Sequence, residues 1–297
     1  MDDKTDIQEP ADSFGSVMTK AEDKIVTDGR TTVKPVPKRQ IQKRYMNSKL
    51  NYPILIAGFS GPGVVGSISA NYIIEQLHMH QISYVESEFI MPAVIYIGGN
   101  LRHPFRIYAN DVGNVCILVC EIPIMSVGVY SVLNTVVKWA KNVGVKEIMV
   151  LEGISVLDQG VILDTNRKAI VLSNDADTID DNRFLRHLDK EDNTSSKSYD
   201  RAYVTGISGG LLAACLSNGI ACKGLVVPTS ANIPDPEGAA IMLESINSLG
   251  NESIKINVEP LRKWAADLKE RLQEMNKAIL RQQQGQNIDE RQQGIYT

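Results

Sequence analysis

The feature that most constrains the fold is a short apolar run, YPILIAGF at residues 52–59, which leads through a glycine turn into a helical pattern. The run has almost no polar face, and this is typical of a strand that is buried on both faces of a sheet. The next stretch, SGPGVVGSISANYIIEQL, has the pattern of a helix that opens after the glycines. We therefore predict a buried strand at residues 53–58, with Ile54, Leu55 and Ile56 inaccessible to solvent.

Strand-like and helix-like segments follow each other from about residue 50 to residue 250. The strand-like segments are rich in β-branched and aromatic residues: QISYVESEF, AVIYIGG, FRIYAN, NVCILVCEI, KEIMVLEGI and IACKGLVVPT. The helix-like segments are YSVLNTVVKWAKNVG, VTGISGGLLAACLSNG and PDPEGAAIMLESINSL. This alternation predicts a three-layer α/β domain at residues 51–255. Because several strands between residues 82 and 122 have no helix between them, we expect a mixed sheet.

Two polar segments lie outside this pattern. Residues 1–50 lack hydrophobic periodicity: the first thirty are acidic and small, and KPVPKRQIQKRYMNSK is basic. We predict a disordered N-terminal arm, with a basic patch that binds a partner as the open alternative. Residues 174–201 are also polar and form a long excursion from the domain.

The C-terminal part of the chain predicts an amphipathic helix over residues 256–284. Apolar residues recur there at spacings of four and three, as in a coiled-coil seam; they include Leu261, Leu268, Leu272 and Met275. Such a seam either packs on its own domain or joins protomers, and we favour self-association. The remaining residues, 285–297, are glutamine-rich and predict a flexible tail.

Composition excludes several function classes. The chain of 297 residues has a formal net charge of −4 and a pI near 5.7, so it has no general attraction to nucleic acid or anionic lipid. The polar N-terminus is unlike a signal peptide, and no apolar run approaches the roughly 20 residues of a membrane span. The four cysteines lie within apolar runs and suit a reducing compartment. We expect a cytoplasmic protein that binds neither nucleic acid nor membrane.

The loop GPGVVG matches the spacing of a dinucleotide-binding fingerprint. Gly61, Gly63 and Gly66 follow a strand and open a helix, and Glu86 lies 20 residues after Gly66. Against this interpretation, Pro62 removes a backbone donor from the loop, and the following strands do not continue a strand–helix–strand unit. The alternative is a tight turn where the glycines let a helix approach a strand closely.

Other catalytic and metal-binding patterns are weak. A Walker A sequence is absent, and His78 and His80 have no further ligands nearby in the sequence to complete a metal site. Ser208 lies in GISGG, which has the spacing of a nucleophile elbow, but no histidine follows it. We therefore interpret this stretch as a glycine-rich helix entry, and we expect no cofactor and no enzymatic activity.

Five stretches together resemble a known family. ILIAGFSGPGVVGSISANYIIEQL, FRIYAN, WAKNVGVKEIMVLEGI, VTGISGGLLAACLSNGI and IPDPEGAAIMLESIN are similar to the second type of proteasome assembly chaperone in its archaeal form. The resemblance spans roughly residues 50–275. It implies a mixed α/β fold like that of the purine nucleoside phosphorylases without their activity. It also implies a homo-oligomer, for which we assume a tetramer, and a proteasome partner.

The resemblance gives meaning to the last three residues, Ile295, Tyr296 and Thr297. They fit the C-terminal signal of proteasome activators, which is a hydrophobic residue, a tyrosine and any last residue. The two apolar side chains would fill a pocket between α-ring subunits, and the Thr297 carboxylate would pair with a lysine there. We therefore predict an oligomeric, ATP-independent proteasome chaperone or activator that docks these residues in the α-ring of the core particle and promotes gate opening. The alternative function is a nucleotide-binding enzyme that uses the loop from Gly61 to Gly66.

Overall fold

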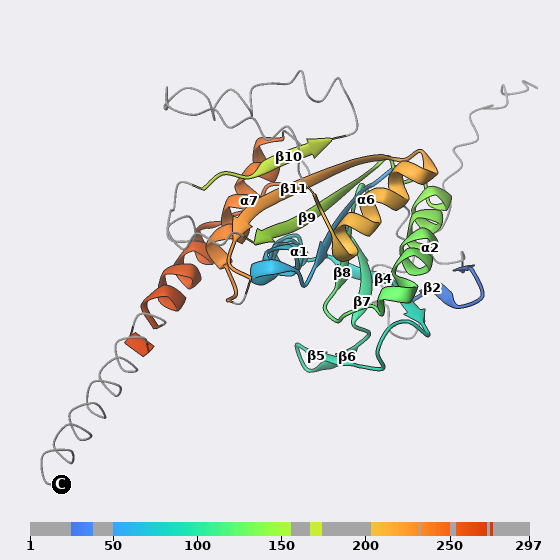
Figure 1. Ribbon diagram of the computed structural model, residues 1–297, viewed down its shortest axis with the longest axis horizontal. Helices are drawn as coiled ribbons and strands as arrows, with labels where there is room; N and C mark the ends of the chain where they lie inside the picture. Colours follow the sequence, from blue (N-terminus) through green and yellow to red (C-terminus); the bar gives the residue numbers. More distant parts are fainter. Residues whose placement is uncertain are drawn as a thin grey trace, which may run out of the picture.

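The computed structural model describes residues 25–37, 50–155, 167–173, 203–231, 233–249, 254–271 and 274–275. Its centre is a nine-stranded mixed sheet in the order β1-β2-β4-β7-β8-β3-β9-β11-β10 (Figure 1). The strands are β1 Val26–Thr27, β2 Thr31–Pro35, β3 Ile54–Phe59, β4 His80–Ser87, β7 Phe105–Ala109, β8 Val115–Cys120, β9 Glu147–Ser155, β10 Ile170–Ser173 and β11 Ala221–Thr229. Strands β8, β3, β9 and β11 are parallel, and the other pairings are antiparallel. The prediction of a mixed α/β sheet is confirmed.

Strand β3 lies in the middle of the sheet, as its apolar sequence predicts. It pairs in parallel with β8 on one side and β9 on the other, so that Ile56 faces Ile117 and Met149. Leu55 and Ile56 are fully buried. Ile54 is half-buried because it begins the strand, so the prediction of full burial is wrong for this residue.

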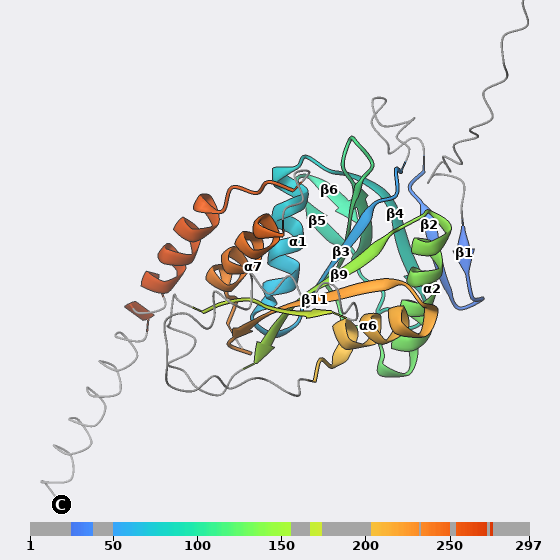
Figure 2. The ribbon, with the colours of Figure 1, turned by 90° about the horizontal axis from the view of Figure 1, so that it is seen from above.

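Two pairs of helices cover the two faces of the sheet (Figure 2). Helices α1 (Val65–Gln76) and α7 (Pro236–Ser248) pack on one face, and α2 (Val129–Asn142) and α6 (Gly206–Asn218) pack on the other. Each face has its own apolar core, one beneath α2 and α6 and one beneath α1 and α7. The fold therefore has three layers, as expected. Among the described residues, no helix is both long enough and apolar enough to cross a membrane.

Part of the predicted N-terminal arm belongs to the sheet. Strand β2 pairs with β4, and Val33 is fully buried against the α2 face of the sheet. The Thr31 hydroxyl hydrogen-bonds to that of Ser87, and Lys34 forms an ion pair with Glu86. The prediction of disorder over residues 1–50 is thus wrong for residues 26–35. Their alternation of buried and half-buried positions is too short to stand out among the surrounding polar residues.

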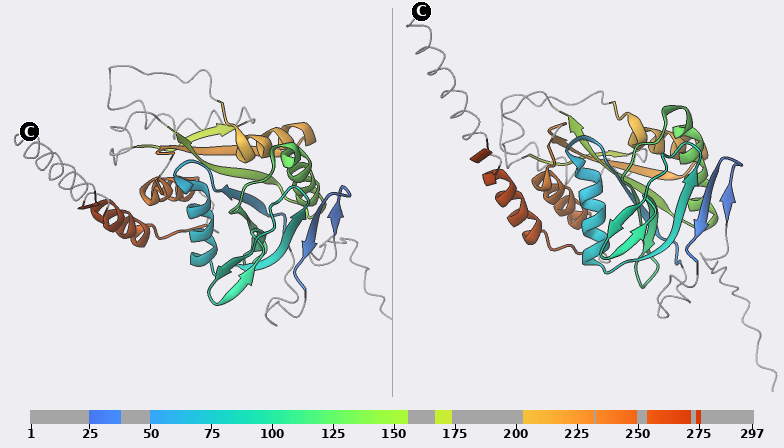
Figure 3. Two further views of the ribbon diagram at one scale, coloured as in Figure 1. Left: turned by 60° about the horizontal axis from the view of Figure 1, so that its bottom comes forward. Right: turned by 90° about the horizontal axis from the view of Figure 1, so that it is seen from below.

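A separate hairpin follows β4. Strands β5 (Ile95–Ile97) and β6 (Asn100–Arg102) pair only with each other, through a turn at Gly98 and Gly99 whose φ angles are +55° and +82°. Such positive φ values favour glycine. The hairpin projects from the body of the domain (Figure 3). It returns the chain to β7, which begins at the same end of the sheet where the parallel strands end.

Candidate functional site

The predicted docking residues Ile295, Tyr296 and Thr297 lie outside the described residues, as does Leu272 of the predicted seam. The structure does describe the helix that leads toward them, at residues 259–271 and 274–275. We call this the C-terminal helix. Its attachment to the domain decides how the end of the chain is presented.

The start of the C-terminal helix is fixed to α7 and α1. Arg262 forms ion pairs with Glu237 and Glu244 of α7, at 3.3 and 2.7 Å. Just before the helix, the Tyr72 hydroxyl of α1 donates to the Asn257 carbonyl at 2.7 Å. Together with a buried apolar segment, these contacts hold the start of the helix against its own domain. That segment comprises Ile254, Ile256 and Val258.

Exposure rises along the predicted seam. Leu261 is 2% exposed and belongs to the core beneath α1 and α7, and Ala265 is also buried. Leu268 is half-buried, whereas Met275 is 59% exposed. Leu261 therefore packs within its own protomer, which is the alternative that we did not favour. Only Leu268 and Met275 remain, among the described seam residues, as a predicted contact between protomers.

The glycine loop lies at the carboxyl ends of the parallel strands, where α/β sheets bind ligands. Its glycines allow close approach of backbone segments. A Cβ atom on Gly66 would overlap the Leu151 carbonyl, and one on Gly63, whose φ is +62°, would overlap the Thr229 side chain. On the strand side, Gly58 faces the Gly66 carbonyl in the same way. These contacts support the interpretation of a tight strand–helix crossing.

A buried carboxyl group occupies the mouth of this loop. The Glu152 side chain lies against Gly61, where a Cβ atom would overlap Oε1. Its other oxygen, Oε2, accepts a hydrogen bond from the Ser208 hydroxyl at the start of α6. Burial raises the pKa of Glu152, and the hydrogen bonds from Ser208 and the Gly153 amide only partly offset it. A carboxyl at this position takes the space that a bound phosphate would need beside Gly61.

Glu86 cannot complete a dinucleotide site with the loop. It lies in β4, and strands β7 and β8 separate β4 from β3. A dinucleotide fold would instead place the second strand beside the first. The Glu86 carboxylate also forms an ion pair with Lys34. The structure therefore does not support the alternative of a nucleotide-binding enzyme at Gly61–Gly66.

Ser208 lies in the first turn of α6, as the interpretation of a glycine-rich helix entry requires. The helix begins at Gly206 with Thr205 as its N-cap residue. The sequence does not reveal Glu152 as the partner of Ser208, because Glu152 lies 56 residues earlier in the chain.

The predicted absence of a metal site at His78 and His80 concerns the other end of α1. In the described ranges no three metal-ligating side chains lie together, and Nδ1 of His80 is 3.8 Å from Oδ1 of Asp111. His78 is exposed.

Arg167 and Asp235 form a buried ion pair at the start of α7. Asp235 accepts hydrogen bonds from Arg167, from the Thr229 hydroxyl and from the Gly238 amide of α7. Burial alone would raise the pKa of Asp235, but these hydrogen bonds outweigh it, so the pKa lies below its usual value. Arg167 also donates to the Pro228 carbonyl at 2.8 Å. The carboxylate is thus fully engaged as the N-cap of α7.

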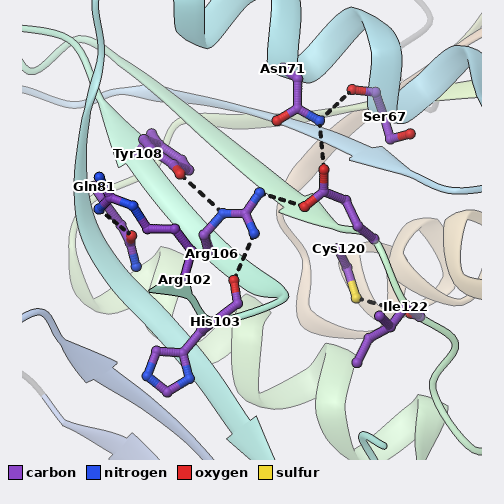
Figure 4. Close-up of polar contacts among 10 residues, drawn as sticks. Ser67, Asn71, Gln81, Arg102, His103, Arg106, Tyr108, Cys120 and Ile122 are labelled. Atoms are coloured by element: carbon purple, nitrogen blue, oxygen red, sulfur yellow. Dashed lines mark hydrogen bonds and ion pairs between the residues drawn. The ribbon is translucent and has the colours of Figure 1, made fainter. Parts of the chain in front are cut away.

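A second buried ion pair, between Arg106 and Glu121, lies next to α1 (Figure 4). Arg106 of β7 is fully buried and donates to the Glu121 carboxylate, the His103 carbonyl and the Tyr108 hydroxyl. Asn71 of α1 donates to the same carboxylate at 3.0 Å. The network ties β7 and α1 to Glu121, the residue that follows β8. Its donors and acceptors satisfy one another, which is typical of a structural rather than a reactive group.

Two segments of the chain carry exposed apolar side chains that the sequence analysis did not predict. Tyr96 and Leu101 of the β5–β6 hairpin are 72% and 70% exposed. Val127, next to the start of α2, is 80% exposed. A signal was present: residues 89–101 and 122–137 contain no Asp, Glu, Lys or Arg.

Comparison with known proteins places the chain among relatives of similar length. A family model described as the PAC2 family matches residues 55–276. An uncharacterised protein of Methanocaldococcus jannaschii is 30% identical over 223 residues, which covers 75% of this chain and 85% of the relative. A Thermoplasma acidophilum protein of unknown function has a solved structure with a TM-score of 0.61 and 31% identity, covering 80% of this chain and 91% of that one. The structure of Pyrococcus furiosus PbaA, described as an archaeal homologue of proteasome-assembly chaperone, has a TM-score of 0.62 and 27% identity, with coverage of 77% and 93%.

Proposed function

Because this chain belongs to the PAC2 family, whose model matches residues 55–276, we propose that it is an oligomeric, ATP-independent chaperone or activator of the proteasome. The observation that carries the proposal is the similarity to PbaA, an archaeal homologue of proteasome-assembly chaperone, over 93% of that chain. The partner would be the core particle of the proteasome.

We propose that Ile295, Tyr296 and Thr297 supply the docking contact with the α-ring. Burial of the Ile295 and Tyr296 side chains offers roughly 3–5 kcal/mol before ordering costs, so one docked segment binds weakly. Several segments on one oligomer bind far more tightly, because each later contact is intramolecular. The C-terminal helix supports this role, since its exposure rises from Leu261 to Met275 and it leads away from the domain.

A binding and activation assay tests the proposal. The intact protein should retain the core particle in a pull-down and stimulate its cleavage of a small fluorogenic peptide without ATP. Tyr296→Ala and deletion of residues 295–297 should abolish both effects, and Tyr296→Phe should give an intermediate result because it loses one hydrogen bond, worth about 1 kcal/mol, at each docked segment.

Two controls accompany this assay. The mass and melting temperature of each variant should equal those of the intact protein, so that loss of binding reports the docking contact alone. If the intact protein does not bind the core particle, the proposed function is wrong. If the intact protein and both disruptive variants stimulate cleavage equally, the docking role of residues 295–297 is wrong.

A further inference from the structure

The four cysteines of the chain lie in one apolar core but in different elements. Cys116 and Cys120 belong to β8, Cys215 belongs to α6 and Cys222 belongs to β11. All four carry free thiols, and all four are buried in the core beneath α2 and α6. The proposed docking function uses none of these thiols, so their arrangement needs its own explanation.

A tight turn brings Cys215 and Cys222 together. Cys215 lies in the last turn of α6, and Cys222 is the second residue of β11. Between them Gly219, with a φ of +61°, ends the helix, and the Ile220 amide donates to the Cys215 carbonyl at 3.1 Å. The chain therefore reverses directly from the helix into the strand.

Both thiols lie between α6 and the sheet. Gly224 lies under Leu212 of α6, since a Cβ atom on Gly224 would be 3.4 Å from Cδ1 of Leu212. Cys222 is two residues before Gly224 in the same strand, so its side chain points to the same face. Cys215 is fully buried against this face, and its thiol hydrogen-bonds to the Cys222 sulfur.

Strand geometry excludes the other pairings within one chain. Cys116 and Cys120 are four residues apart in one strand, which separates their Cα atoms by about 13 Å. Strands β3 and β9 lie between β8 and β11, so about 14 Å separates β8 from Cys222 and from the thiol of Cys215 that contacts it. A disulfide needs Cα atoms less than about 7 Å apart. Cys215 and Cys222 are therefore the pair that can be bridged.

The hydrogen bond makes the two thiols chemically unequal. The pKa of Cys215 is raised because its thiol donates the hydrogen bond and is buried, whereas the pKa of Cys222 is lowered because its sulfur accepts that bond. By contrast, burial raises the pKa of Cys120 to about 12. The thiolate is the nucleophilic form of cysteine. Cys222 is therefore the thiol that reacts first, and Cys215 lies where it can attack the oxidised sulfur.

The pair lies close beneath the surface of the domain. Cys222 is 4% exposed, and the residues next to the pair in the chain, Leu216 and Ala221, are exposed. Opening of the last turn of α6 is enough to admit an oxidant as small as hydrogen peroxide, since helix ends open at low cost. Cys116 has no such access, because β8 is an interior strand between β7 and β3.

We propose that Cys215 and Cys222 form a reversible disulfide when the protein meets a peroxide, and that this bridge fastens the end of α6 to the start of β11. The Cys222 thiolate attacks one peroxide oxygen, the O–O bond breaks, hydroxide departs and Cys222 becomes a sulfenic acid. The Cys215 sulfur then attacks the Cys222 sulfur, the S–S bond forms, the S–O bond breaks and water departs. Together the two thiols lose two electrons and two protons, and one hydrogen peroxide becomes two water molecules.

Thiol mapping on the intact protein tests the inference. After exposure to hydrogen peroxide, the protein is denatured in iodoacetamide, digested without reductant and analysed by mass spectrometry. Peptides with Cys215 linked to Cys222 should appear, whereas Cys116 and Cys120 should be alkylated. Dithiothreitol added before alkylation should restore all four reactive thiols. Alkylation of Cys215 and Cys222 after the peroxide, or their oxidation to sulfinic acid without a link, would overturn the inference.

Single substitutions assign the two roles. Cys222→Ser removes the first nucleophile, so Cys215 should stay reduced, whereas Cys215→Ser should leave a sulfenic acid on Cys222 that dimedone traps. Cys116→Ala is the matched control, because Cys116 is fully buried in the same core but has no partner thiol to bridge. This control should form the link as fast as the intact protein does. Oxidation of Cys116 or Cys120 as fast as Cys222 would overturn the inference, and the map of the intact protein decides it even if a serine variant does not fold.

A thermal shift gives a second measurement of the bridge. A disulfide between residues 215 and 222 restricts the unfolded chain, so the oxidised protein should melt about 5 °C above the reduced protein. Dithiothreitol should reverse the shift, and peroxide should not produce it in Cys222→Ser. An equal or lower melting temperature of the bridged protein would overturn the proposed fastening of α6 to β11. None of these variants alters residues 295–297, so the result is independent of the proposed docking function.

Discussion

Glu152 is the residue whose environment departs most from that of an ordinary surface carboxyl. The residue is 8% exposed, its Oε2 accepts a hydrogen bond from the Ser208 hydroxyl, and among the described residues its Oε1 has no hydrogen-bond partner. Burial raises the pKa of Glu152. The native protein therefore holds this proton to a higher pH than the unfolded chain does, and the protonated group contributes stability that is lost as pH rises through the folded pKa.

The substitution Glu152→Gln tests this at the residue scale. The neutral amide cannot ionise, so the free energy of unfolding of the variant, minus that of the wild type, should increase as pH rises from the ordinary glutamate value of 4.5 through the folded pKa. Urea denaturation at several pH values measures the difference. Ser208→Ala removes the donor that favours the charged form, so it should raise the folded pKa of Glu152 further and extend the pH-dependent loss of stability to higher pH. A difference that stays constant or falls with pH would contradict the prediction.

At the scale of elements, the C-terminal helix has two halves with different roles. Its first turns belong to the core beneath α1 and α7, and the Arg262 ion pairs fix it to α7. Its later described residues, such as Met275, are exposed to solvent. The helix therefore connects a rigid domain to the segment that we propose to dock.

Two alanine substitutions separate these halves. Leu261→Ala should lower the free energy of unfolding by about 2–4 kcal/mol, because it opens a cavity in a packed core. Met275→Ala removes a side chain that is 59% exposed and should change it by less than about 0.5 kcal/mol. Chemical denaturation followed by far-ultraviolet circular dichroism measures both. Equal effects would show that the helix does not divide in this way.

At the scale of the whole molecule, assembly and docking depend on each other. Leu268→Asp, which should separate protomers joined by the predicted seam, leaves residues 295–297 unchanged, yet it should weaken binding to the core particle at least tenfold, because a single docking segment lacks the gain from multivalency. The apparent Kd is measured by adding increasing concentrations of the variant to surface-immobilised core particle. Undiminished affinity of a monomeric variant would mean that one segment is sufficient. Leu216→Asp, at an exposed residue of α6, provides the control that leaves the predicted seam intact.

The sequence predicts the apolar and periodic parts of this molecule well. Strand β3 could be predicted because a strand paired on both sides is apolar throughout, and α2 because its apolar positions recur at helical spacing. Strand β2 was missed because five residues at a sheet edge carry a weak pattern. The pairing of Glu152 with Ser208 depends on packing between residues 56 positions apart, which no local pattern encodes. The docking residues remain a sequence hypothesis, because they lie outside the described residues.

The place of β3 in the sheet has a consequence for synthesis on the ribosome. This strand is among the first parts of the domain to emerge, yet its neighbours β8 and β9 begin only at Val115 and Glu147. Both hydrogen-bonding edges of an apolar strand thus stay open while the intervening residues are made. Completion of the parallel block waits for β11, which ends at Thr229. A nascent chain of this kind should depend on factors that shield exposed strands. Slow translation before residue 115 would lengthen the time during which the open edges of β3 can aggregate.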